Sequence, residues 1–464
     1  MGRTIMDKLA ILLALIAANF SSVNADLTTI IDAKSNRGTW EGWGTSLAWW
    51  AVAFGNRQSL PGLGFNIARY NADVSSWNSY NGSKMVVSPN MIPSRQVEGF
   101  WQDWGSADPS SSSWKWSADA NQRSMLSKAQ DRGADILELF SVSPMWWMCK
   151  NHNPSGSDDG SSDNLQSWKY QQHALYLATV AKYAADNWNI RFQSVEPFNQ
   201  PSANWWNGGM GTQEGCHFEA STQETVLGYL GTELRSRGLS SVISASDESY
   251  YDEALTTFNR ISSSTMAESL PSSPCHRYQW VGGRDSLYST VSRAGKKLWQ
   301  SELVSNLLLD MRWLRPTAWV YWQALDRAGG WGLIDADNDK KTIGSVNQKY
   351  FVLAQFARHI RPGMRILDGG SDYTVAAYDA TTRKLVVIAV NWGDAQYINF
   401  DLSKFSTPGV NDTVIKRWTT QIESGSRYVE RSDTPLDGTK FWSRFEKNMV
   451  QTFEITVSSD LIPI

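Results

Sequence analysis

The spacing of apolar residues between positions 39 and 330 predicts strands that alternate with helices. Apolar runs of the length of buried strands occur at 42–49, 63–69, 134–140, 192–195, 242–245, 278–281, 298–300 and 319–321. Helices are predicted at 120–132, at 168–188 and from a capping box at Ser221 and Glu224 to Gly238. Parallel neighbours need crossover connections, so repeated strand-then-helix units indicate parallel strands. About eight strands favour a closed (β/α)8 TIM barrel in the α/β class, with a doubly wound open sheet as the alternative.

The pattern changes after about residue 365. Short β-like runs at 373–378, 385–391, 397–402 and 449–457 follow one another without comparable helices, which predicts an all-β domain. The segment 26–36 has no place in the barrel pattern and is expected to add a strand to this domain. We therefore predict a barrel at 39–362 and a C-terminal all-β sandwich domain formed by 26–38 and 363–464.

The N-terminal 25 residues have the features of a secretory signal peptide. Arg3 and Lys8 precede an apolar run from Leu9 to Phe20, and small residues suitable for cleavage end at Ala25. The run is short for a transmembrane helix, although a retained anchor is the alternative reading. We expect a secreted, extracellular protein whose mature chain begins near Asp26.

Secretion gives meaning to two sequons and three cysteines. Asn81 and Asn411 are predicted glycosylation sites on exposed loops. Cys149 and Cys216 both follow predicted strand ends, so we expect them to be bridged, with Cys275 free. The three cysteines and five histidines show no zinc-binding spacing, and no metal is predicted.

Composition excludes some partners and suggests another. The formal net charge of -3 gives no broad attraction to nucleic acid or to anionic membranes. The chain contains 24 tryptophans, and doublets such as Trp49-Trp50, Trp146-Trp147 and Trp205-Trp206 lie beside loop-like sequence. Most will be core residues, but flat aromatic rings with a few polar neighbours can also line a saccharide cleft, where they stack on the apolar C–H faces of sugars.

Reactive side chains of a (β/α)8 barrel gather at the C-terminal ends of its strands. Two strand ends carry candidates: 195–201 closes the fourth strand and contains Asn199 and Gln200, and 298–302 closes the seventh and ends at Glu302. Asn-Glu-Pro at the fourth strand and a second Glu at the seventh are typical of retaining glycoside hydrolases. Here the first motif reads Asn199-Gln200-Pro201.

Longer segments make the resemblance specific. The chain resembles glycoside hydrolase family 30, especially its fungal endo-β-1,6-galactanase branch, in the segments 40–50, 66–71, 143–149, 211–218, 319–323 and 330–332. The resemblance implies a barrel fused to a β-sandwich, a β-1,6-linked galactan substrate, no cofactor, and a chain that we expect to be monomeric.

The resemblance also assigns roles to residues. It makes Glu302 the nucleophile and position 200 the acid/base, with Asn199 bonding the sugar 2-hydroxyl and Arg69 orienting the nucleophile. The alternative interpretation is that Glu302 and Arg69 are ordinary ion-paired residues, but their positions within recognised family segments favour roles in the active site. The remaining substrate-site predictions from the resemblance are His276, Tyr278 and Trp322, with Trp146, Trp205 and Trp206 on the cleft wall.

Three departures from the family pattern bear on function: Gln200, the segment 269–277, and the short stretch from Glu302 to Trp313. A glutamine side chain cannot donate the proton that the leaving sugar oxygen needs. Glu196, four residues earlier, would sit about 13 Å deeper in the barrel at 3.3 Å per residue and cannot replace it. The alternatives to a working galactanase are therefore a saccharide-binding homologue without turnover and a hydrolase of another β-linked glycan.

Overall fold

The computed structural model describes residues 26–54, 62–261, 269–272, 282–301, 307–327, 331–405 and 414–457. The chain separates into two compact units, one formed by Arg37–Met364 and the other by the residues before and after that range. Within the described residues, no helix combines the length and the apolar character needed to cross a bilayer.

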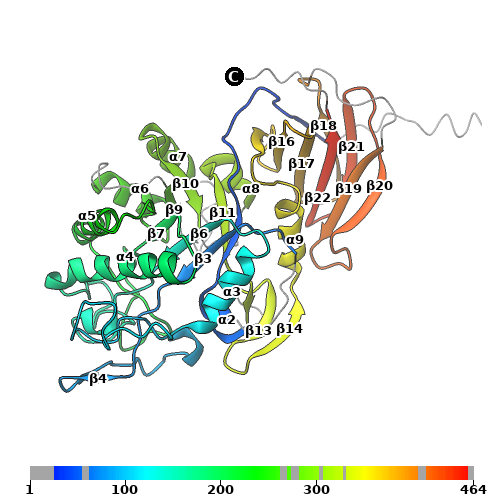
Figure 1. The fold of residues 1–464 in the computed structure, drawn as a ribbon. Helices are drawn as coiled ribbons and strands as arrows, with labels where there is room; N and C mark the ends of the chain where they lie inside the picture. The colour runs from blue at the N-terminus through cyan, green and yellow to red at the C-terminus, as the bar shows by residue number, and fades with distance from the viewer. Residues whose placement is uncertain are drawn as a thin grey trace, which may run out of the picture. The chain divides into compact units, whose positions relative to one another are not determined.

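The larger unit is built on an eight-stranded parallel sheet, which gives the (β/α)8 TIM-barrel fold (Figure 1). Its hydrogen-bonded order is β8-β7-β6-β3-β2-β11-β10-β9. Strands that follow one another along the chain are therefore neighbours, except β8 and β9 at the two ends of this order, and the last strand, β11, pairs with the first, β2. The strands are β2 (Gly42–Ser46), β3 (Ile67–Asn71), β6 (Ile136–Phe140), β7 (Ser194–Glu196), β8 (Val242–Ile243), β9 (Ser269–Ser272), β10 (Lys297–Gln300) and β11 (Ala318–Gln323).

Helices follow the strands along the chain, and in Figure 1 α4 to α7 lie outside the sheet. In α4, one apolar stripe, Leu177, Val180, Ala181 and Ala184, is buried, as its spacing predicted. The helices are α2 (Ala48–Phe54), α3 (Ala120–Gln130), α4 (Tyr170–Asn187), α5 (Ala220–Ser236), α6 (Tyr251–Arg260), α7 (Arg284–Arg293), α8 (Leu307–Leu309) and α9 (Gln348–Ala357). Short helical turns lie at Pro93–Arg95, Trp146–Met148, Ser167–Lys169 and Asp310–Leu314.

Two local predictions were wrong, and a third falls outside the described residues. The predicted first strand at 42–49 ends at Ser46, and α2 begins at Ala48, because the apolar run continues into a buried helix. The capping box at Ser221 does not form: α5 begins at Ala220, so Ser221 lies inside the helix, and the N-cap residue Glu219 makes no side-chain cap bond. The described strand in sixth position is Ser269–Ser272, whereas the predicted range 278–281 lies outside the described residues.

The smaller unit is all-β, as predicted. A six-stranded sheet has the order β15-β16-β17-β22-β19-β20, and a three-stranded sheet has the order β1-β18-β21. Strand β1 (Leu27–Ile30) pairs in parallel with β18 (Gln396–Asp401), so the N-terminal segment does join this unit. The other strands are β15 (Arg365–Asp368), β16 (Thr374–Asp379), β17 (Lys384–Asn391), β19 (Val414–Gln421), β20 (Val429–Pro435), β21 (Lys440–Phe445) and β22 (Met449–Thr456).

Each unit has its own apolar core. That of the smaller unit contains Phe400, Phe441 and Phe453, whose rings pack against one another. In the barrel, Gly44 on β2 is required by close strand packing, since a Cβ there would lie 2.6 Å from the Cβ of Ile67. Smaller additions to the barrel are the hairpin β4 (Ser79–Tyr80) and β5 (Ser83–Lys84), and the sheet of β12 (Leu325–Asp326), β13 (Ile334–Asp337) and β14 (Thr342–Val346).

Candidate active site

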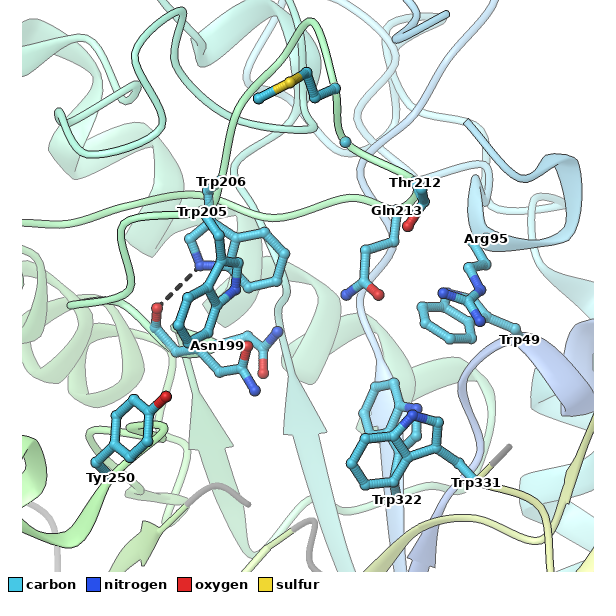
Figure 2. A pocket seen from close by; sticks show the side chains of 13 residues that line it. Trp49, Arg95, Asn199, Trp205, Trp206, Thr212, Gln213, Tyr250, Trp322 and Trp331 are labelled. Atoms are coloured by element: carbon cyan, nitrogen blue, oxygen red, sulfur yellow. Dashed lines mark hydrogen bonds between the residues drawn. The ribbon is translucent and has the colours of Figure 1, made fainter. Parts of the chain in front are cut away.

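A cleft of about 290 Å³ opens at the C-terminal ends of the barrel strands (Figure 2). Asn199 and Gln200 follow β7, Tyr250 follows β8, and Trp322 lies near the end of β11. This is the end of a (β/α)8 barrel at which reactive groups are expected. The cleft is lined by Trp49, Arg95, Asn199, Gln200, Trp205, Trp206, Met210, Gly211, Thr212, Gln213, Tyr250, Trp322 and Trp331.

The backbone of Gln200 is held from two sides. Its N–H donates to the carbonyl of Asp247 over 2.6 Å, and its carbonyl accepts the indole N–H of Trp206 over 3.0 Å. Its φ of 50° lies in the left-handed region, which a residue with a side chain adopts at a cost that surrounding contacts must offset. These bonds determine where the side chain of position 200 enters the cleft.

Asn199 is almost completely buried beside Gln200, and its Oδ1 has no hydrogen-bond partner among the described residues. An unpartnered buried amide oxygen is costly unless a ligand or water satisfies it. Its position on the cleft surface is therefore suited to a sugar hydroxyl, in agreement with the role that the family resemblance implies.

Tryptophans form opposite walls of the cleft. Trp205 is 44% exposed, whereas Trp206 is nearly buried and its ring lies against Gly215. A Cβ at Gly215 would come within 2.1 Å of that ring, so glycine is required there. On the other side, Trp322 meets Trp49 edge to face, with their ring centroids 5.4 Å apart. The structure thus places the predicted Trp205, Trp206 and Trp322 around one cavity.

Arg69 lies deeper, in a completely buried ion-pair network. It donates to Glu138 over 2.7 Å and to Asp247 over 2.9 Å, and its third nitrogen reaches the carbonyl of Ser301 over 3.2 Å. Arg69 does not line the cleft, and the role predicted for it, orienting the carboxylate of Glu302, involves a residue outside the described ones. Its bond to Ser301 nevertheless places it beside the chain segment that leads to position 302.

Glu196 is a structural carboxyl, as its depth on the strand predicted. It is completely buried in the barrel, and its Oε1 accepts the N–H of Phe198 over 3.1 Å. Burial raises the pKa of Glu196 well above its usual value, and the carboxylates of Asp247 and Glu138 raise it further. Glu196 does not line the cleft.

Several cleft residues were not singled out from the sequence, and three of them carry polar groups at the cavity: Arg95, Gln213 and Tyr250. The guanidinium carbon of Arg95 stacks 4.4 Å above the Trp49 ring. Gln213 points into the cavity beside it (Figure 2). Gln213 lies within the family-like segment 211–218, which was the one available signal, whereas Arg95 and Tyr250 come from loops without a recognisable motif.

Two other predictions were wrong. Trp146 belongs to the apolar core and not to the cleft wall, because it is completely buried and donates its indole N–H to Ser76 over 2.6 Å. The disulfide predicted between Cys149 and Cys216 is absent, and both are buried free thiols. Each thiol instead contacts backbone carbonyls, Cys149 that of Pro144 at 3.8 Å and Cys216 that of His217 at 3.3 Å.

The remaining predicted residues divide into two groups. Asn81 lies at the turn of the β4–β5 hairpin and is exposed, as an acceptor for glycosylation would have to be. The predicted nucleophile, two predicted sugar contacts, one cysteine and the second sequon lie outside the described residues: Glu302, His276, Tyr278, Cys275 and Asn411.

A group of buried carboxyls packs between loops that follow β3 and β7. Tyr70 donates its hydroxyl to Asp119 over 2.5 Å, and Gln122 donates to both Asp119 and Asp73. Burial raises the pKa of Asp119 to about 7 and that of Glu214 to about 8. For Asp73, burial and then the neighbouring carboxylates raise the pKa well above its usual value.

These pKa values predict a loss of stability as the solution becomes alkaline. The unfolded-state pKa values of Asp and Glu are about 4, so up to pH 8 the folded chain binds more protons than the unfolded chain and the free energy of unfolding falls with rising pH. Burial lowers the pKa of His173 to about 4. This shift makes the free energy of unfolding rise with pH, but only below about pH 6.5, the pKa of histidine in the unfolded chain. We therefore expect the melting temperature to be lower at pH 8 than at pH 6.5. In Asp119→Asn, the drop in melting temperature between these two pH values should be smaller than in the original chain. A melting temperature that stays constant or rises over this range would contradict the prediction.

Comparison with known proteins agrees with this site. Residues 55–278 match the family model of O-glycosyl hydrolase family 30. An endo-β-1,6-galactanase from Hypocrea rufa is 56% identical over 96% of this chain and 98% of its own length.

Solved structures share the fold at low sequence identity. The catalytic domain of the family 30 xylanase C from Talaromyces cellulolyticus aligns with a TM-score of 0.66, at 17% identity over 92% of this chain and 100% of its own. A conserved exported protein from Bacteroides fragilis aligns with a TM-score of 0.69, at 16% identity over the same shares. With the galactanase similarity extending over nearly the whole sequence, the chain belongs to glycoside hydrolase family 30, in its fungal endo-β-1,6-galactanase branch.

Proposed function

We propose that this protein is secreted and has the fold and cleft of a retaining hydrolase that acts on β-1,6-linked galactan, such as the side chains of arabinogalactan. We also propose that Gln200 severely impairs its turnover of this substrate. The observation that supports the substrate is the 56% identity to an endo-β-1,6-galactanase over nearly the whole chain. The tryptophan-lined cleft with Asn199 and Gln200 on its surface supports a saccharide ligand. Secretion rests on the signal-like pattern of the first 25 residues.

The proposed mechanism requires two carboxyl groups about 5–5.5 Å apart. Glu302 attacks the anomeric carbon and forms a glycosyl-enzyme bond, while an acid at position 200 protonates the leaving oxygen. That group then takes a proton from the water that releases the sugar. Glutamine at 200 fills nearly the same space as glutamate but performs neither proton transfer, so substrate binds and turns over poorly.

A second candidate is a saccharide-binding protein without any turnover, which Gln200 itself favours. Reducing-sugar release from de-arabinosylated arabinogalactan separates residual hydrolysis from binding alone. A panel of β-1,3-, β-1,4- and β-1,6-linked galacto-oligosaccharides tests the linkage. Preference for another linkage, in binding and in turnover, would overturn the proposed substrate.

Trp205 offers a direct test of the saccharide cleft. Trp205→Ala should weaken binding of a β-1,6-linked galacto-oligosaccharide by about tenfold, because it removes one stacking platform. Its ring is 44% exposed, so the melting temperature should hardly change. Isothermal titration calorimetry measures the affinity. The matched control is Trp168→Ala, since Trp168 is also exposed but does not line the cleft. Equal affinities of the two variants would contradict the assignment of this wall.

A further inference from the structure

The segment that carries Gln213 has no regular secondary structure, yet it forms one wall of the cleft. The N–H of Ile92 donates to the carbonyl of Thr212 over 3.1 Å, which joins this segment to the turn that carries Arg95. Gln213 and Arg95 both line the cavity (Figure 2). Neither side chain has a hydrogen bond or an ion pair within the described parts of the chain, so both are available to a ligand.

Glu214, the next residue, points the opposite way, into the protein. It is 1% exposed, and its Oε1 accepts the hydroxyl of Ser75 over 2.6 Å and the N–H of Val97 over 3.3 Å. The loop after β3 folds back on itself here, because Ser75 also donates its own N–H to the carbonyl of Val97. One carboxyl oxygen of Glu214 therefore holds the Gln213 segment against two parts of the loop that carries Arg95, one at Ser75 and one at Val97.

We propose that Glu214 is a positioning residue that holds Gln213 and Arg95 against the substrate and does so as a neutral carboxylic acid. The described groups whose pKa Glu214 raises are all uncharged or acidic: Asp73 on the β3 loop, Tyr176 on α4, and Cys149 after β6. Asp119, at the start of α3, adds a further carboxyl through its effect on Asp73. No cation of this set would compensate an ionised Glu214, so ionisation introduces repulsion behind the wall.

The inference rests on the proposed saccharide substrate, and its test separates the two. The probe is a β-1,6-linked galactotetraose, titrated into the protein with its original sequence. Because this sequence has Gln200, the ligand should remain intact during the titration. Glu214→Ala should weaken binding by about tenfold, because Ser75 and Val97 lose their shared acceptor and the wall loosens. Glu214→Gln keeps a neutral acceptor of the same shape, and its affinity should stay within about twofold of the original.

The pH profile distinguishes positioning from simple support of the fold. Affinity of the original chain should fall as the pH rises past about 8, where Glu214 ionises, whereas Glu214→Gln should show a smaller fall. A purely structural role would lower the melting temperature of Glu214→Ala without changing the affinity of the folded fraction. Equal affinities of Glu214→Ala and Glu214→Gln at pH 6, or identical pH profiles of Glu214→Gln and the original chain, would overturn the proposal.

Hydrogen exchange on the full chain provides a readout without ligand. Glu214→Ala should accelerate exchange at residues 91–99 and 211–216 and leave β17 and β22 of the other unit unchanged. If Glu214→Ala does not fold, Ser75→Ala removes only the donated hydroxyl and should produce the same local acceleration to a smaller degree. Failure of galactotetraose to bind the original chain would refute the substrate, while unchanged exchange at both segments would refute the role of Glu214.

Discussion

Gln200→Glu should raise the rate of galactan hydrolysis by about 10²–10⁴-fold, the usual contribution of general acid–base assistance. The backbone at position 200 is already fixed by its bonds to Asp247 and Trp206. The substitution therefore adds a proton donor at a position whose backbone is already held in place, and it requires no rearrangement of the chain. Reducing-sugar release from de-arabinosylated arabinogalactan, measured at substrate saturation, gives the ratio.

Two controls make that result specific. Gln200→Asn keeps an amide but shortens the side chain, and it should remain as inactive as the original chain. Gln200→Glu combined with Glu302→Gln should lose the gain, because the proposed nucleophile is absent. If the original chain already hydrolyses galactan as fast as Gln200→Glu, position 200 is not the acid/base and the interpretation of the fourth strand is wrong.

Arg69→Met should lower the free energy of unfolding of the barrel by about 3–5 kcal/mol, the cost of breaking a buried ion pair from one side. Glu138 and Asp247 would then be left in the barrel interior without the guanidinium that both accept from. Denaturant unfolding followed by tryptophan fluorescence measures the change.

The matched control breaks an exposed pair. Lys182 and Asp186 on α4 are i,i+4 partners at the surface, and Lys182→Met should cost less than about 0.5 kcal/mol. Adding Glu138→Gln and Asp247→Asn to Arg69→Met should recover part of the loss, since neutral amides no longer require a cation. A loss from Arg69→Met as small as that from Lys182→Met would show that the network does not stabilise the fold.

The sequence by itself determined the architecture and the position of the cleft. Strand and helix periodicities are local, so β6, α4 and the all-β second unit could be predicted from the residues that form them. Parallel order then required the strand ends to meet, which brought Asn199, Gln200 and Trp322 to one end of the barrel. The departure at Gln200 needed no structure at all, because it depends only on which residue occupies the motif.

Only the tertiary structure decided what surrounds those residues. Trp146 and Trp205 both belong to tryptophan doublets, yet one is buried in the core and the other is exposed at the cleft, because burial depends on long-range packing. Ser221 failed as a helix cap because the preceding loop placed Glu219 at the start of α5. Arg95 and Glu214 are far apart in the chain, and their segments are brought together only because Val97 and Ser75 fold against Glu214. Contacts of this kind between loops leave no periodic pattern in a sequence, so the wall of the cleft could be found only in the folded chain.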